Sequence, residues 1–351
     1  MDFPKHFSIF SSAPTRICDN GGWTDTWFSQ HGQIFSIAIE PRAAVQILCT
    51  PRSSSRPQIQ ISALNYDLTY FRELGEDWED HPLIEAAIDR VGIPEQFDVD
   101  IFLHSDAPPG ASMGTSAAIT VALIGALDCL TPGRLTAYEI AYEAHRVETE
   151  DLRLQSGIQD QLAAAFGGIS FIDMVHYPHA IRSEVSISPD IWWELENRLL
   201  VVYMGTPHSS SEVHKQVITH LENAGPTEHR LENLRKTASA ARNALSYGDF
   251  NALGLALSHN TECQRALHPD LVSPLAEKLI KVAQTAHVLG WKVNGAGGSG
   301  GSISFLLDGD LKNRFKLEAA LQSSCPECQT IRPRLAQDGI RRHLFPTGSN
   351  L

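Results

Sequence analysis

A run of small and hydroxyl-bearing residues, Asp106–Ala118, has the composition of a loop that could bind an anion. It reads DAPPGASMGTSAA and leads into the apolar run Ala117–Leu130, which is typical of a helix. The first N–H groups of a helix lack internal partners and carry partial positive charge, and both features suit a phosphate group. Gly110 and Gly114 let the backbone approach such a ligand without a Cβ in the way.

Two hydroxyl residues near the end of this loop, Thr115 and Ser116, could bind a phosphate oxygen or a Mg²⁺ ion. The loop is not a Walker A loop, because no lysine follows Gly114. The alternative is an ordinary Gly/Pro turn in which Thr115 caps a buried helix.

Two carboxylates, Glu148 and Asp160, are the second candidate for chemistry. Asp160 follows the turn residue Gly157 and lies at the start of a short Ala-rich helix, where a carboxylate is stabilised as the anion. Such a group can accept a proton or lie near a metal ion. Each residue alone could instead be a cap or a solvated carboxylate, but together with the hydroxyl-bearing loop they supply the oxygen ligands that Mg²⁺ prefers.

A third cluster surrounds Arg16, at the end of a predicted strand, with Asp19 and Asp25 in the segment RICDNGGWTDT. The arginine could neutralise phosphoryl charge, and Asp25 could accept hydrogen bonds from substrate hydroxyls. The alternative is a surface ion pair between Arg16 and one of these carboxylates. Trp23 is of a residue type that more often packs than binds ligands.

A fourth segment, Asn294–Ser302, reads NGAGGSGGS and contains a formal G-x-G-x-x-G match. A dinucleotide-binding fingerprint leads into a helix, whereas these glycines lead into SISFLL, which has the pattern of a strand. We therefore exclude a Rossmann fold. The glycines favour close backbone approach to a ligand or to another part of the chain, and a flexible β-turn is the alternative.

The elements that must position these segments form an α+β pattern in the first half of the chain. Thr136 and Glu139 form a capping box at the start of a helix that runs to about Glu148, and Gln159–Phe166 is a second, shorter helix. A further helix is predicted over 83–91. Strands are expected over 7–17, 33–39, 43–49, 58–64, 97–103 and 169–172, with Pro41–Arg42 separating the second from the third.

The second half of the chain is also predicted to be α+β. Residues 178–197 are polar and are expected to be irregular, so the domain boundary is placed there. Helices are predicted near 211–223, 227–246, 249–266, 271–289 and 311–321. Strands are predicted over 198–204, 291–294, 302–307, 329–334 and 340–345.

The composition, with 42% hydrophobic and 20% charged residues among 351, is that of a globular protein. A formal net charge of −13 argues against a nucleic-acid partner or an anionic membrane surface. No apolar run approaches the ~20 residues that cross a bilayer, and the first residues lack a signal-peptide pattern. The six cysteines are expected to be reduced, which indicates the cytosol, and the C-x-x-C pair Cys325 and Cys328 is expected to be structural.

Taken together, the four segments resemble the GHMP small-molecule kinase superfamily. PPGASMGTSAA is similar to that family's phosphate-binding motif, PPGAGLGSSAA, with Ser112, Met113 and Thr115 in place of Gly, Leu and Ser. APTRICDNGGWTD resembles its N-terminal sugar-kinase motif, GIQDQLAAAFGG the segment with its catalytic aspartate, and VNGAGGSGGS its third motif. The GGWTDT segment is most similar to fucokinases, and the HRVE…GIQDQLAAAFGG segment to D-glycero-D-manno-heptose 7-phosphate kinases.

The resemblance implies an α+β fold of two domains, with the site between them. A ribosomal protein S5 domain 2-like domain that binds ATP and Mg²⁺ would span 1–185, and a ferredoxin-like domain would span 186–351. Asp160 would be the base on the acceptor hydroxyl, Arg16 would stabilise that base and the transferring phosphoryl group, and Ser116 and Glu148 would hold Mg²⁺. ATP would be bound by Pro109, Gly110, Ala111, Ser112, Met113, Gly114, Thr115, Ser116 and Ala117. The substrate would contact Asp25, Gly22, Trp23, Gly297 and Gly298.

The implied function is an ATP-dependent, cytoplasmic sugar kinase that phosphorylates the anomeric hydroxyl of a sugar or sugar phosphate, such as a fucose-like sugar or a heptose 7-phosphate. The alternatives are a catalytically silent sugar- and ATP-binding regulator on the same fold, and a GHMP kinase for a non-sugar alcohol such as mevalonate. A phosphorylated acceptor would need a basic cluster, for which Arg146, Arg153 and Lys215 are candidates.

Overall fold

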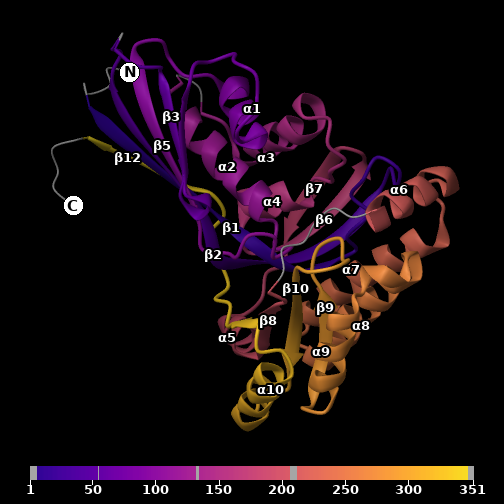
Figure 1. Ribbon diagram of the computed structural model, residues 1–351. Helices are drawn as coiled ribbons and strands as arrows, with labels where there is room; N and C mark the ends of the chain where they lie inside the picture. Colours follow the sequence, from indigo (N-terminus) through magenta and orange to yellow (C-terminus); the bar gives the residue numbers. More distant parts are fainter. Residues whose placement is uncertain (1–5, 54, 132–133, 206–211, 347–351) are drawn as a thin grey trace.

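The computed structural model describes residues 6–346, apart from 54, 132–133 and 206–211. The chain builds two β-sheets, one of eight strands and one of four. In the view of Figure 1, the larger sheet and helices α1–α4 form the upper part, and the smaller sheet with α7–α10 forms the lower part. This α+β arrangement agrees with the expected fold class.

The larger sheet is organised around one long strand, β2, which is 20 residues long. Strand β1 pairs along one side of β2, while β5 and β6 share its other side. The full order is β12-β1-β2-β5-β3-β4, and β7 pairs with β6. Its strands are β1 (Phe7–Asn20), β2 (Gly32–Pro51), β3 (Ile59–Ala63), β4 (Leu68–Arg72), β5 (Phe97–Ser105), β6 (Ile169–His176), β7 (His179–Glu184) and β12 (Arg341–Pro346).

The expectation of two strands separated by Pro41–Arg42 was wrong, because β2 runs through both residues. A shift in the β1–β2 register between Pro14 and Thr15 takes Pro41 out of the ladder. The missing N–H of a proline therefore costs no ladder bond there. The neighbouring N–H, that of Glu40, donates instead to a backbone carbonyl outside the two strands.

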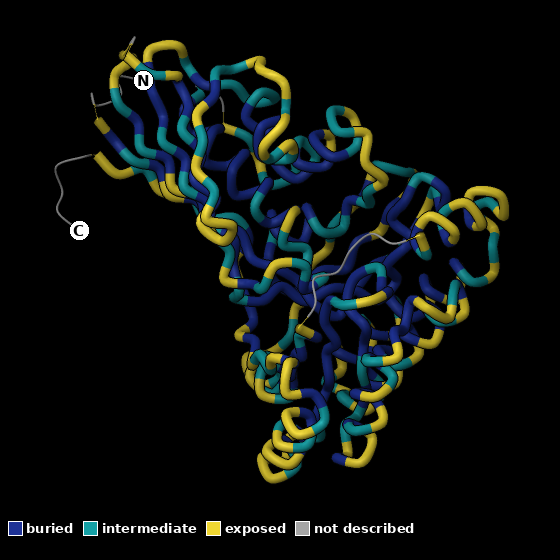
Figure 2. Tube along the Cα trace, in the orientation of Figure 1, coloured by how far each residue is buried: buried dark blue, intermediate teal, exposed yellow. Residues whose placement is uncertain are grey.

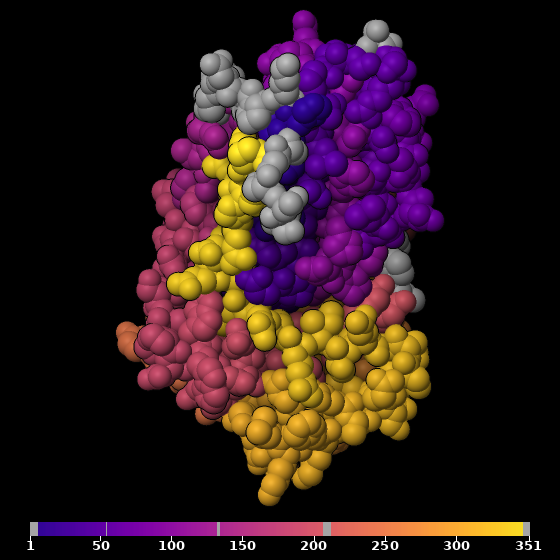
Figure 3. Space-filling model, turned by 90° about the vertical axis from the view of Figure 1, so that its left-hand side faces the viewer, coloured from indigo at the N-terminus to yellow at the C-terminus, as the bar shows by residue number. Residues whose placement is uncertain are grey.

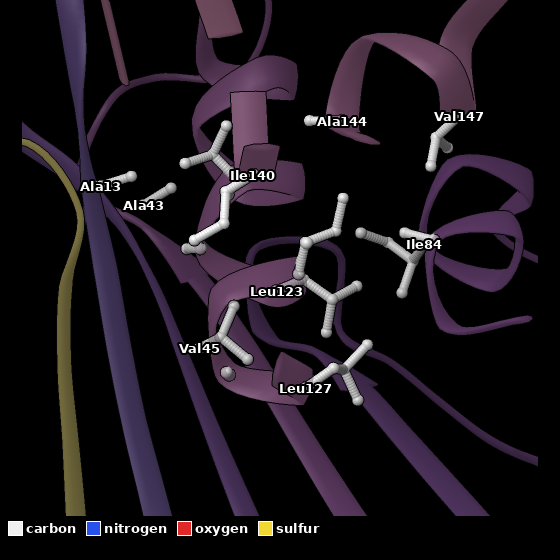
Figure 4. Packing of buried hydrophobic residues seen from close by; sticks show 14 of the residues in the cluster. Ala13, Ala43, Val45, Ile84, Leu123, Leu127, Ile140, Ala144 and Val147 are labelled. Carbon is white, nitrogen blue, oxygen red and sulfur yellow. The ribbon is translucent and has the colours of Figure 1, made fainter. Parts of the chain in front are cut away.

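Four helices and a π-helical turn cover one face of the larger sheet and enclose its main core (Figure 4). Helix α2 lies at the centre and is almost completely buried, as expected for a helix that is apolar on all sides. Leu123 and Leu127 of α2 pack toward Ile84 and Val45 in that core. The elements are α1 (Pro82–Val91), α2 (Thr115–Asp128), α3 (Ala137–Arg146), the turn η2 (Val147–Asp151) and α4 (Gln159–Phe166), with a short 3₁₀ turn η1 (Leu64–Tyr66) before β4. The predicted capping box of Thr136 and Glu139 is present at α3.

The smaller sheet has the strand order β11-β8-β10-β9, with all pairs antiparallel. This is the order of a ferredoxin-like βαββαβ unit, as the resemblance implied. Its strands are β8 (Leu199–Tyr203), β9 (Val288–Val293), β10 (Ser302–Leu307) and β11 (Gln329–Ile331). The helices of this half are α5 (Pro189–Arg198), α6 (Glu212–Ala224), α7 (His229–Ser246), α8 (Phe250–Leu267), α9 (Pro274–Gln284) and α10 (Leu311–Ser324), with a 3₁₀ turn η3 (Pro269–Leu271).

Two further expectations about the second half were wrong. Residues 178–197 are not irregular, since they contain β7 and α5. The start of α5 carries a readable signal, because Ser188 caps it and Pro189 occupies its first turn. The helix predicted over 271–289 ends at Gln284, and the chain then enters β9.

One cysteine expectation also needs correction, because Cys325 and Cys328 form a disulfide rather than a reduced pair. Both residues are buried in the core under the smaller sheet, which is consistent with the structural role expected for them. The other four cysteines are free and buried.

The two halves of the chain are joined by a shared core and by the last strand. One buried cluster combines Phe35 and Met113 of the first half with Leu199, Leu253 and Leu306 of the second, and Figure 2 shows buried segments gathered where the two halves meet. Strand β12 returns to pair with β1 at the edge of the larger sheet, and in Figure 3 this yellow end of the chain runs up beside the indigo N-terminal part. The division into 1–185 and 186–351 remains a prediction. No described helix has the length and apolar content that crossing a bilayer requires.

Helix α8 approaches β9 closely enough to exclude a side chain at the contact. A Cβ on Gly254 would lie 2.4 Å from the backbone oxygen of Leu289, and a Cβ on Gly290 would lie 2.0 Å from the backbone oxygen of Gly254. Because β9 leads into the glycine-rich segment and α8 holds that segment through Gln264, this contact helps to position the candidate site.

We expect Gly254→Ala to destabilise the protein by about 1–3 kcal/mol, although Gly→Ala inside a helix ordinarily stabilises by up to about 1 kcal/mol. The added Cβ meets backbone, so α8 must move away from β9. Gly125→Ala in α2 is the matched control, since its Cβ would meet only side chains, those of Ile340 and Arg342, which can shift more easily than backbone. Urea unfolding of both variants tests this, and an equal or smaller loss for Gly254→Ala would contradict the contact.

Candidate active site

A cavity of about 710 Å³ gathers residues from segments that are far apart in the sequence. Each of the four segments singled out from the sequence contributes to its wall. The charged and polar residues that line it include Arg16, Asp19, Asp25, Ser116, Glu148 and Asp160, together with Gly22, Trp23 and Gly295. The predicted catalytic residues, Arg16 and Asp160, and the predicted metal ligands, Ser116 and Glu148, therefore line one cavity.

The centre of this site is a bidentate ion pair between Arg16 and Asp160. Arg16 Nε donates to Asp160 Oδ1 at 2.7 Å, and NH2 donates to Oδ2 at 3.0 Å, although the residues are 144 positions apart. Arg16 is 4% exposed, while the Asp160 side chain is 28% exposed toward the cavity. Burial lowers the Arg16 pKa, but Asp160 and Asp19 outweigh it and the net shift is upward. Arg16 thus stays charged and fixes the orientation of the Asp160 carboxylate.

The third nitrogen of Arg16 connects this pair to the loop that precedes α2. NH1 donates to the Ser112 carbonyl at 2.6 Å, and the Arg16 backbone N–H donates to the Met113 carbonyl at 2.9 Å. Asp19 lies 4.0 Å from NH1 and is also buried. The alternative of a surface ion pair therefore does not describe Arg16.

The loop itself has the conformation of a backbone cradle before a helix. Gly110, Ser112 and Gly114 all have positive φ, at 68°, 56° and 69°, and α2 begins at Thr115. Glycine adopts a positive φ at lower cost than serine, which explains why the motif that this loop resembles has Gly where this chain has Ser112. Thr115 does not cap α2, because Gly114 is the N-cap, and Thr115 Oγ1 is buried with no hydrogen-bond partner among the described residues. That hydroxyl and the helix start suit an anionic ligand.

Asp25 is held against the start of α4 by the backbone. Its Oδ2 accepts from the Gln159 N–H at 3.0 Å, and the residue is 2% exposed. A Cβ on Gly157 would lie 2.1 Å from Oδ2, so only glycine allows this approach. Burial raises the Asp25 pKa to about 6, although the Gln159 N–H opposes the shift.

Glu148 reaches the cavity from the π-helical turn η2 rather than from the expected end of α3. Such turns often occur at functional sites, because the extra residue redirects side chains. Burial raises the Glu148 pKa to about 7, and the charge of Asp160 adds to this shift. Together with the Ser116 hydroxyl, Glu148 presents hard oxygen ligands to the same space.

The glycine-rich segment lines the cavity through Gly295 and Ala296. Trp23 Nε1 donates to the Ala296 carbonyl at 3.1 Å, so Trp23 links the N-terminal segment to this loop. Gly297 and Gly298 are not among the lining residues and lie against Leu271, so their predicted contact with a substrate stays a prediction. The Gly298 N–H donates to the Leu271 carbonyl, and a Cβ on Gly297 would lie 2.4 Å from the same oxygen.

Two of the three basic candidates for an anionic substrate group lie at the cavity. Arg153 and Lys215 line it, and both are exposed. Arg153 has a φ of 54°, an uncommon conformation for a residue other than glycine. Arg146 does not line the cavity and instead pairs with Glu143 and Glu150.

The sequence reasoning missed three residues that build this site: Gly157, Gln159 and Lys292. Gly157 was interpreted only as a turn residue before Asp160, although its position indicated a close approach. Gln159 acts through its backbone N–H, which no residue type reveals. Lys292 was readable as an unusual charge in an apolar strand next to a glycine-rich loop, and it is completely buried.

Comparison with protein families identifies this architecture. Residues 82–168, which contain the loop, α2, η2 and Asp160, match the family model of the GHMP kinases N-terminal domain.

Residues 82–168 therefore contain a GHMP kinase N-terminal domain.

Among curated GHMP kinase relatives, the chain is similar to D-glycero-alpha-D-manno-heptose 7-phosphate kinase of Campylobacter jejuni, with 27% identity over 58% of this chain and 60% of the relative. It is also similar to the bifunctional fucokinase/GDP-fucose pyrophosphorylase of Arabidopsis thaliana, with 26% identity over 85% of this chain and 30% of the relative. The chain thus spans less than two thirds of the length of these two relatives.

A solved GHMP kinase structure shows the same fold over nearly the whole chain. The crystal structure of a D-glycero-D-manno-heptose 1-phosphate kinase from Bacteriodes thetaiotaomicron superposes with a TM-score of 0.74 at 22% identity. The match covers 95% of this chain and 98% of that chain. The GHMP kinase fold inferred from the four segments is therefore confirmed.

We expect Asp25→Asn to stabilise this protein at pH 7.5 by about 1–3 kcal/mol. A carboxyl whose folded pKa of about 6 exceeds its unfolded value near 3.9 binds more protons when folded, so its ionisation penalises the native state above pH 6 and not below pH 4. The amide keeps an oxygen for the Gln159 N–H and carries no charge.

Urea unfolding at pH 7.5 and at pH 4.5 measures this effect. The stability difference between variant and wild type should shrink as the pH falls. Groups such as Glu148 titrate in both proteins, so the difference isolates Asp25. Equal stability at pH 7.5 would contradict the burial cost assigned to this carboxylate.

Proposed function

We propose that this GHMP kinase is an ATP-dependent sugar kinase that transfers the γ-phosphoryl group of ATP to the anomeric hydroxyl of a sugar or sugar phosphate. The observation that carries the proposal is the Arg16–Asp160 pair, which lies in the same cavity as Ser116 and Glu148 and touches the loop at Ser112. A general base, a fixed cation and an anion-binding helix start are the parts that phosphoryl transfer needs.

The nucleotide phosphates would bind at the start of α2, where Thr115 Oγ1 lacks a partner among the described residues. A smaller cavity of about 100 Å³ is lined by Pro109, Gly110 and Thr115 of the same loop. Both cavities share Leu83 and Ser116 as lining residues. The smaller cavity would therefore take the nucleoside, with its phosphates passing Ser116 into the larger one.

The residues at this point fit a Mg²⁺ ion. Ser116 and Glu148 would hold it, since both line the larger cavity beside the loop. Within the described part of the chain, no three His, Cys, Asp or Glu residues cluster in a way that could hold a metal. This pattern suits an ion that takes few protein ligands and fills its other positions with phosphate and water. When bound, the ion would neutralise charge on the phosphates.

Asp160 would accept the proton of the attacking sugar hydroxyl. Its carboxylate is exposed to the cavity while Arg16 holds both of its oxygens, so its orientation is set before substrate binds. An anomeric hydroxyl is more acidic than an ordinary alcohol, which eases this step. Arg16 would also offset negative charge on the transferring group.

The sugar would bind beside Asp25 and the glycines of the N-terminal segment. Asp25 lies in the cavity wall with Gly22 and Trp23, and its ionised form can accept hydrogen bonds from sugar hydroxyls. Arg153 and Lys215 in the same wall favour an acceptor that carries a negative group away from the reacting hydroxyl. A phosphorylated sugar or a sugar acid has that character.

A coupled ADP-release screen of the wild-type chain tests the proposal. The acceptors are fucose, galactose, mannose, arabinose, glucuronate, heptose 7-phosphate and, as the non-sugar control, mevalonate. We expect ADP release that depends on at least one sugar. Binding of sugar and ATP without any ADP release would instead indicate a silent regulator, and release with mevalonate alone would indicate a non-sugar kinase.

We expect Asp160→Asn to lower kcat by about 10²–10⁴, as for loss of a general base, with little change in the KM for the sugar. The amide can still bond to Arg16 but cannot take the proton. Asp190→Asn is the control, because Asp190 is an exposed carboxylate in the first turn of α5. Steady-state kinetics with the best acceptor provides the measurement, and near wild-type kcat for Asp160→Asn would exclude this residue as the base.

A further inference from the structure

Lys292 is a fully buried lysine that the proposed chemistry does not use. It projects from β9, the strand that leads into the glycine-rich segment, and has 0% exposure. Its Nζ donates to Asp19 Oδ1 at 3.3 Å and to Gln264 Oε1 at 3.2 Å, and also to the Val293 carbonyl. Burial lowers the pKa of Lys292, and the charge of Asp19 opposes that shift. A buried charge is retained only where it is paired, so the charge of Lys292 depends on Asp19.

That partner, Asp19, lies at the junction of the two sheets and joins three groups. Oδ1 accepts from Lys292 of the smaller sheet and from the Gly295 N–H at 3.0 Å, and it faces Arg16 NH1 of the larger sheet at 4.0 Å. Its other oxygen, Oδ2, is buried and has no partner among the described residues. Asp19 Oδ2 can therefore still accept a hydrogen bond from a neighbouring donor.

Arg16 is the neighbouring donor that could form a closer ion pair with Asp19. At present its Nε and NH2 hold Asp160, and NH1 holds the Ser112 carbonyl rather than Asp19. Because the Arg16 nitrogens are bonded in this way, NH1 stays 4.0 Å from Asp19 Oδ1. The arrangement is consistent with Lys292 satisfying Asp19 from the opposite side.

We propose that Lys292 is a positioning residue for the phosphoryl-transfer site: by pairing with Asp19 across the junction of the two sheets, it leaves the guanidinium of Arg16 free to hold Asp160. This inference rests on the proposed kinase function. Without the lysine charge, the buried Asp19 carboxylate keeps only the Gly295 N–H and the more distant Arg16, and Arg16 turns toward it. Asp160 then loses one or both of its hydrogen bonds and its set orientation.

The test compares Lys292→Met with wild type under conditions where both are folded, using the best acceptor from the screen. We expect kcat to fall about 10–100-fold, the range associated with a misplaced catalytic group. The KM values for ATP and sugar should stay within about threefold of wild type, because neither binding surface is altered. Where Lys292→Met does not fold, Lys292→Gln replaces it, since it lacks the charge but keeps an N–H donor toward Asp19.

The double variant Asp19→Asn/Lys292→Met separates positioning from loss of packing. It removes both charges and keeps an oxygen for the Gly295 N–H, so Arg16 has no carboxylate to turn toward except Asp160. We expect its kcat to return to within about fivefold of wild type.

Thr261→Val is the control for a loosened β9. Thr261 is fully buried and bonds to the backbone of Trp291 and Val293 without touching Asp19. It should lower stability while leaving kcat within about twofold of wild type.

Wild-type kcat in the folded Lys292 variant, or a double variant as slow as the single one, would overturn the positioning role. A wild-type protein that releases no ADP with any acceptor would instead overturn the proposed function, so the two failures are distinguishable.

Discussion

The ion pair between Arg16 and Asp160 is the interaction on which the rest of this site depends. It joins the strand that starts the larger sheet to the first turn of α4, across 144 positions of sequence. The same guanidinium holds the loop before α2 at Ser112, so one arginine sets the geometry of both the Asp160 carboxylate and that loop. This is possible because α2 and α4 pack on one core with β1, which fixes the distance between them.

The buried carboxylates around this pair lower the stability of the folded protein when they are ionised. Asp25 and Glu148 are buried carboxylates whose pKa values are raised to about 6 and about 7 by burial. Neither has its own cation at hydrogen-bond distance among the described ion pairs, in contrast to Asp160. Destabilised ionisable groups in a cavity are typical of sites shaped by function, where the ligand supplies the missing partners. The large shared core compensates for this cost.

Much of the fold could be predicted because local signals were clear. The ends of α4, the strand β10 and the capping box at Thr136 follow directly from glycines, alternation and capping chemistry. The errors came from tertiary context. Strand β2 continues through Pro41 because a register shift removes the ladder bond that proline lacks, and β7 is a polar edge strand that pairs only with β6.

The candidate site could be predicted in residue types and order, but not in its supporting contacts. Asp160, Glu148 and Ser116 carry recognisable chemistry in recognisable motifs. The approach of Gly157 to Asp25 and the pairing of Lys292 with Asp19 depend on where distant backbones pass each other. The same limit applies to Gly297 and Gly298, which are drawn away from the cavity by Leu271.

The most direct test of the central claim is a crystal structure of the chain with a non-hydrolysable ATP analogue, Mg²⁺ and the acceptor found by ADP release. The quantity to measure is the distance from the Asp160 carboxylate to the acceptor hydroxyl that faces the terminal phosphate. The account predicts about 2.6–3.2 Å, with Arg16 still paired to Asp160 and the phosphates at the start of α2. A reacting hydroxyl held by another carboxylate, or a nucleotide bound away from that helix, would contradict it.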